Sequence, residues 1–131
     1  MAMAFQGAIN TGLSKIVGLL QATFIVHVIA SLLLAFLLLF PISPGNLLKV
    51  TSVPWYLFLG GPLSVVIVYT VVFSMGKIGV APATTAIIVG QVLTALVIDH
   101  WGLFGLQRLV FSWWQLLGLG FFALGAKLLL G

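Results

Sequence analysis

Four long apolar stretches alternate with short polar ones along the chain. Groups of proline, glycine and asparagine separate the stretches, as expected of turns. A helix that crosses the hydrocarbon core of a bilayer needs about 20 consecutive, mostly apolar residues. The pattern therefore predicts four membrane-spanning helices, over Leu19 to Phe40, Trp55 to Met75, Val80 to Ile98 and Phe111 to Leu130.

The first segment, Met1 to Ser14, is apolar but short. At about 1.5 Å per residue, a helix over it would reach only about 20 Å. It lacks the basic region and the small-residue cleavage site of a signal peptide, so we expect it to be retained. We predict an all-α integral membrane protein, a single transmembrane domain over residues 1–131 with five helices and a short first one. Four spanning helices behind an interfacial N-terminal helix are the alternative.

Composition supports the membrane assignment and excludes several classes of protein. Of the 131 residues, 63% are hydrophobic and 5% are charged, whereas a soluble domain carries about 25% charged residues. One acidic residue, two histidines and no cysteine cannot form paired carboxylates, a metal cluster or a cysteine nucleophile. We therefore predict no enzyme, no metal and no cofactor. The five basic residues are spread singly, which argues against nucleic acid as a partner.

The loops alternate in length if the chain crosses the membrane five times. The short loops, residues 15–18 and 76–79, would lie on one side, and the long loops, residues 41–54 and 99–110, on the other. All the tryptophans flank the long-loop side, as in an interfacial aromatic belt. They are Trp55, Trp101, Trp113 and Trp114.

The distribution of lysine and arginine gives little preference for one orientation. Lys15, Lys77 and Lys127 lie on the short-loop side, against Lys49 and Arg108 on the other side. Such a small bias specifies membrane orientation weakly. Two interpretations follow: the chain inserts in both directions and opposite copies pair, or lipids and a partner impose one orientation.

Polar residues recur at helical spacing within three of the predicted helices. Residues four apart lie on one face of a helix, so each of these helices carries one polar stripe. Together the stripes predict a shared polar seam that faces away from lipid. Its members are Gln6, Asn10 and Ser14, then Thr23, His27 and Ser31, then Thr84, Gln91 and Thr94.

Such a seam has a structural and a functional interpretation. Polar side chains hydrogen-bond between membrane helices, at about 0.6 kcal/mol per bond on average. They also line solute paths, because intramembrane polar residues face a cavity or the protein interior. For serine and threonine we favour helix association, whereas for Asn10, His27 and Gln91 both interpretations stay open. A neutral, hydrogen-bonded His27 is favoured over a proton-coupling one.

The predicted helix over residues 80–98 is followed directly by the only acidic side chain of the chain, Asp99, and then by His100. The two residues either form a charge-assisted pair or cap the loop. We favour the loop role, because helix-end carbonyls need partners and Gly102 can adopt a positive φ. No acidic residue lies inside a predicted helix, which argues against a proton-driven exporter of cations.

Several short motifs occur in an order that resembles the YdcZ-type branch of the drug/metabolite transporter (EamA-like) superfamily. The resemblance covers nearly the whole chain, and its most specific part runs from Gly90-Gln91 to Asp99-His100-Trp101-Gly102. The other matching segments are Gln6-Gly7 with Asn10, Gln21-Ala22-Thr23-Phe24 with His27, Pro54-Trp55, and Gly105.

The resemblance implies a five-helix bundle equivalent to half of a ten-helix transporter. In that superfamily, two halves of inverted topology enclose the substrate path. A single half would therefore need a second copy or a homologous subunit in the opposite orientation. The first helix of this chain is about half a helix shorter than the family pattern. The resemblance brings no assigned substrate and no coupling residues.

Together these observations predict a transporter subunit of a bacterial inner membrane. We expect it to export a small metabolite or amphipathic compound by alternating access, as an antiparallel homodimer or with a homologous partner. The alternative is a non-transporting subunit that scaffolds or regulates another membrane complex, with a polar seam that serves only helix association. The candidate residues of the substrate path are Asn10, His27, Gln91, Tyr69 and Gln6.

Overall fold

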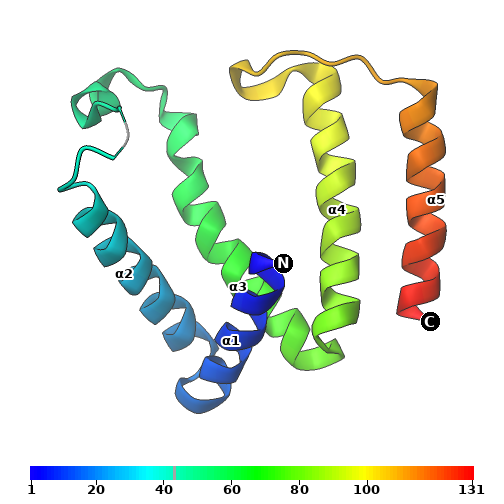
Figure 1. The fold of residues 1–131 in the computed structure, drawn as a ribbon, viewed down its shortest axis with the longest axis horizontal. Helices are drawn as coiled ribbons and strands as arrows, with labels where there is room; N and C mark the ends of the chain where they lie inside the picture. Colours follow the sequence, from blue (N-terminus) through cyan, green and yellow to red (C-terminus); the bar gives the residue numbers. More distant parts are fainter. Residues whose placement is uncertain (43) are drawn as a thin grey trace. The chain divides into compact units, whose positions relative to one another are not determined.

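The computed structural model describes residues 1–42 and 44–131, and this part of the chain is helical without β-strands. The predicted all-α class, with a short first helix, is confirmed. The α-helices are α1 (Ala2–Val17), α2 (Leu19–Leu37), α3 (Gly60–Ile78), α4 (Val80–Trp101) and α5 (Trp113–Leu130). Short 3-10 helices, η1 (Leu47–Ser52), η2 (Trp55–Leu59) and η3 (Leu103–Gly105), lie in the connections (Figure 1).

Four segments are long and apolar enough to cross a membrane. They are Leu19–Leu37, Trp55–Ile78, Val80–Trp101 and Trp113–Leu130. Most of their large apolar side chains are exposed. Apolar surface on this scale marks a protein that contacts lipid. The α1 helix, at 16 residues, is shorter than these spans.

The observed helix ends differ from the predicted ones by a few residues. The α2 helix ends at Leu37 rather than Phe40, ahead of Pro41, since proline disfavours helical geometry in the residue before it. The third span starts at Trp55 as a 3-10 turn and becomes α-helical at Gly60. The α4 helix continues to Trp101 because its first left-handed residue is Gly102, with φ 61° and ψ 43°.

Contacts divide the chain into two compact units, Met1–Phe73 and Ser74–Gly131. In the first unit, α1 and α2 pack against each other as a hairpin joined at Gly18. In the second unit, α4 and α5 pack against each other. The buried apolar residues are few and mostly small or medium in size. They are Ala22, Val71 and Val72 in the first unit, and Met75, Ala83 and Ala126 in the second.

Candidate functional site

The interior of the first unit contains polar side chains. Asn10 on α1 is 6% exposed, and Thr11 on α1 and Thr23 on α2 are also buried. These residues lie among helices whose apolar side chains are mostly exposed. Polar groups inside a membrane face the protein interior or a cavity, because lipid offers them no hydrogen bonds. The first unit therefore has the polar interior that a candidate site requires.

The hydroxyl groups of this interior bond to their own helices. Thr11 Oγ1 donates to the Gly7 carbonyl at 2.7 Å, and Thr23 Oγ1 donates to the Leu19 carbonyl at 2.9 Å. Such bonds satisfy the hydroxyl locally and create no link between helices. The groups left to recognise a solute or to join helices are therefore the larger ones, the amides and the imidazole.

His27 links α2 to α3 through its imidazole ring. Its Nδ1 lies 2.7 Å from the Thr23 carbonyl oxygen, and its Nε2 lies 3.0 Å from Ser64 Oγ on α3. A carbonyl only accepts hydrogen bonds, so Nδ1 must carry a hydrogen and donate it. In the neutral imidazole, Nε2 then accepts a hydrogen bond from the Ser64 hydroxyl. We call this arrangement the His27–Ser64 bridge.

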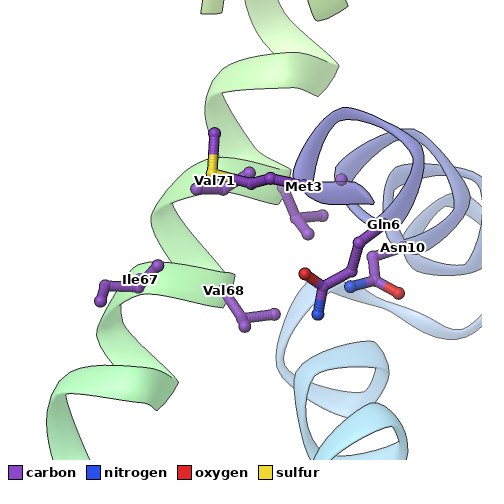
Figure 2. A pocket seen from close by; sticks show the side chains of 8 residues that line it. Met3, Gln6, Asn10, Ile67, Val68 and Val71 are labelled. Atoms are coloured by element: carbon purple, nitrogen blue, oxygen red, sulfur yellow. The ribbon is translucent and has the colours of Figure 1, made fainter. Parts of the chain in front are cut away.

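A small cavity of about 30 Å³ lies between α1 and α3 in the first unit. Figure 2 shows the amides of Gln6 and Asn10 next to each other on α1, with Ile67, Val68 and Val71 on α3. This volume has room for about one or two water molecules. A metabolite would not fit into this volume. The lining residues are Met3, Gln6, Gly7, Asn10, Ile67, Val68, Val71 and Val72.

Tyr69 and Gln91, which were also predicted for the substrate path, do not line this cavity. Tyr69 on α3 is 39% exposed. Gln91 is exposed on α4, in the second unit, and its assignment to the substrate path stays a prediction. On the same helix, Thr94 Oγ1 donates to the Gly90 carbonyl at 2.8 Å. The Thr84 hydroxyl is buried without a hydrogen-bond partner among the described residues.

Ser64 was not among the residues predicted for the substrate path, although it contacts His27. Ser64 is partly buried on α3, where no polar stripe was predicted. Spacing gave no signal of this contact, because its hydrogen-bond partner His27 is 37 residues away in the sequence. Ser64 is a polar residue within a long apolar stretch, four residues after Gly60, and this spacing of small residues is typical of a close helix contact.

Asp99 and His100 accept hydrogen bonds through their backbone carbonyls at the end of α4. The Asp99 carbonyl accepts a hydrogen bond from the Leu109 N–H, and the His100 carbonyl accepts one from Arg108 Nε, both at 2.8 Å. The loop after the helix thus supplies partners to two of its last carbonyls. Within residues 1–42 and 44–131, no three His, Asp or Glu side chains lie close enough together to hold a metal ion.

Comparison with known proteins identifies the family to which this chain belongs. Residues 1–128 match the family described as “Putative inner membrane exporter, YdcZ”. No curated protein and no solved structure matches the chain. The family match covers almost the full length, and it agrees with the four helices that are long and apolar enough to cross a membrane. The chain therefore belongs to the YdcZ family and is an inner-membrane protein of the transporter class.

Proposed function

We propose that this chain is a transport subunit that moves a small solute outward across the inner membrane by alternating access. The solute path runs along the first unit and includes the buried Asn10, the half-buried His27 and the exposed Gln6 at the cavity between α1 and α3. The observation that carries the proposal is the burial of the Asn10 amide, 6% exposed, beside a cavity between two helices. Burying an amide costs free energy, and helix packing alone does not require one there.

The chemistry of the path favours a neutral or zwitterionic solute. The amides of Gln6 and Asn10 both donate and accept hydrogen bonds, so they suit hydroxyl, amide or carbonyl groups. The one acidic residue of the chain, Asp99, lies in the last turn of α4, which belongs to the second unit. The first unit contributes no carboxylate side chain that could serve as the counter-charge of a cation. The apolar side chains of α3 in the cavity wall suit the apolar part of an amphipathic metabolite.

Export is expected to be detectable as accumulation of a small metabolite in the medium. Bacteria that express the chain are compared with bacteria that express Asn10→Leu, by mass spectrometry of the medium. Leucine has the same number and branching of side-chain heavy atoms as asparagine but no amide, so we expect at least one metabolite to accumulate only with the unchanged chain. Thr70→Val is the control, because the exposed Thr70 hydroxyl bonds to its own helix. Identical media for the unchanged chain and for cells without it would support the non-transporting subunit.

The transporter is proposed to assemble from two oppositely oriented copies or from this chain and a homologous subunit. The near balance of basic residues, three on one predicted side and two on the other, supports insertion in both directions. The chain has no cysteine, so single cysteines placed at either terminus report accessibility without background. In intact cells we expect each terminus to be labelled in part of the population. Labelling of one terminus alone would exclude the antiparallel homodimer.

A further inference from the structure

The C-terminal end of α4 is covered by the loop that follows it. Gly102 reverses the chain in the left-handed conformation, and its N–H donates to the Ile98 carbonyl. Further along, Leu109 N–H and Arg108 Nε donate to the carbonyls of Asp99 and His100, each at 2.8 Å. These bonds hold the arginine at the helix end. All of these residues belong to the second unit.

Arg108 offers unused hydrogen-bond donors at this place. A guanidinium has five N–H donors in a planar fork, and one of them is occupied by the His100 carbonyl. Among the described residues, Arg108 makes no other hydrogen bond and no ion pair. Arg108 is exposed, and the chain carries a net charge of +4. A planar, fixed guanidinium without a carboxylate partner is suited to bind an anion, and phosphate above all.

An apolar slot is lined in part by His100, the residue whose carbonyl accepts the hydrogen bond from Arg108. The slot has a volume of about 230 Å³ and is lined by Leu96, Val97, His100, Trp101 and Phe111. The His100 ring meets Phe111 edge to face, with ring centroids 6.4 Å apart. His100 Nδ1 is buried and has no hydrogen-bond partner within the described part of the chain. A ligand that fits this slot would have an apolar chain and one hydrogen-bonding group.

Tryptophan side chains mark the depth of this slot in the membrane. Trp101 is 66% exposed and Trp113, at the start of α5, is 86% exposed. Exposed tryptophans of membrane proteins lie at the level of the lipid headgroups. Arginine, a buried polar nitrogen and an apolar slot therefore occur where a phospholipid presents phosphate, glycerol esters and acyl chains.

We propose that the C-terminal end of α4 binds an anionic phospholipid. The phosphate binds the Arg108 guanidinium, and an acyl chain occupies the slot beside Leu96 and Phe111. A glycerol ester oxygen accepts a hydrogen bond from the N–H at His100 Nδ1. The residues of this site belong to the second unit, whereas the residues assigned to the solute path belong to the first. It would tie α4 and its loop to the lipid surface, and it does not depend on which solute the protein moves.

Binding of phosphatidylglycerol to the purified, delipidated chain tests this proposal. Native mass spectrometry in detergent compares dioleoyl phosphatidylglycerol, dioleoyl phosphatidylcholine and glycerol 3-phosphate as probes. We expect phosphatidylglycerol to bind about tenfold more tightly than phosphatidylcholine, and glycerol 3-phosphate not to bind at the same concentrations. Arg108→Gln should remove this preference. Lys49→Gln, which also removes one exposed positive charge, should preserve it.

Arg108→Lys separates lipid binding from the helix cap. Lysine keeps the positive charge, so we expect this variant to retain part of the preference, although it loses the Nε hydrogen bond to the His100 carbonyl and the planar fork. If Arg108→Gln and Arg108→Lys both lose binding together with helical circular dichroism, Arg108 is only a cap and the proposal fails. Equal binding of both lipids, or an unchanged preference in Arg108→Gln, would also overturn it. Glycerol 3-phosphate binding as tightly as the lipid would show a soluble phosphate site instead.

Discussion

Replacing His27 by leucine is expected to reduce export by about fivefold while the chain still inserts into the membrane. The substitution removes the imidazole from the solute path and with it the 3.0 Å contact to Ser64 on α3. Loss of one hydrogen bond to a neutral group costs about 1 kcal/mol, and every 1.4 kcal/mol is about a factor of ten. The measurement is the rate at which the exported metabolite appears in the medium, divided by the amount of protein in the membrane.

Ser64→Ala and the double variant show whether the bridge acts as a unit. If His27 and Ser64 work together, Ser64→Ala should lower export in the same way, and the double variant should be little worse than either single one. Ser31→Ala is the matched control, because Ser31 is on the same predicted stripe of α2 but exposed. Normal export by His27→Leu, with a stability loss of only about 0.6 kcal/mol, would assign the bridge to helix association alone.

Gly18→Ala is expected to destabilise the α1–α2 hairpin by about 1–3 kcal/mol, because Gly18 has a backbone conformation that is nearly exclusive to glycine. Its φ is 104° and its ψ is 157°, between two helices that are joined by this residue alone. A Cβ would also overlap Gln21 Oε1, although that flexible side chain can rotate away. Backbone strain is therefore the main term. The measurement is the unfolding midpoint in mixed detergent micelles with increasing dodecyl sulfate.

Gly12→Ala is the control for this substitution. Gly12 lies inside α1 with helical geometry, and a Cβ there would have no other atom within 4 Å. Alanine is favoured over glycine inside a helix by up to about 1 kcal/mol. We therefore expect Gly12→Ala to leave stability unchanged or to raise it. Equal stability of Gly18→Ala and the unchanged chain would mean that the linker tolerates another conformation.

The candidate site was only partly predictable from the sequence. Helical spacing placed Gln6 and Asn10 on one face of α1, and both line the cavity. The same reasoning placed Thr23, His27 and Ser31 on one face of α2, but Ser31 is exposed. Spacing assigns residues to a face, whereas burial also depends on how far along the helix its neighbours extend. Ser31 lies in the part of α2 where every residue from Val28 to Leu37 is exposed.

Local chemistry determined the class and the helical segments of this protein. Apolar length, turn residues and the lack of charge are properties of neighbouring residues, so the membrane assignment and the short first helix could be read directly. Tertiary structure alone decided that His27 pairs with Ser64 and that Arg108 folds back onto α4. These features depend on the rotation and approach of separate helices and loops, and no periodicity within one segment encodes them.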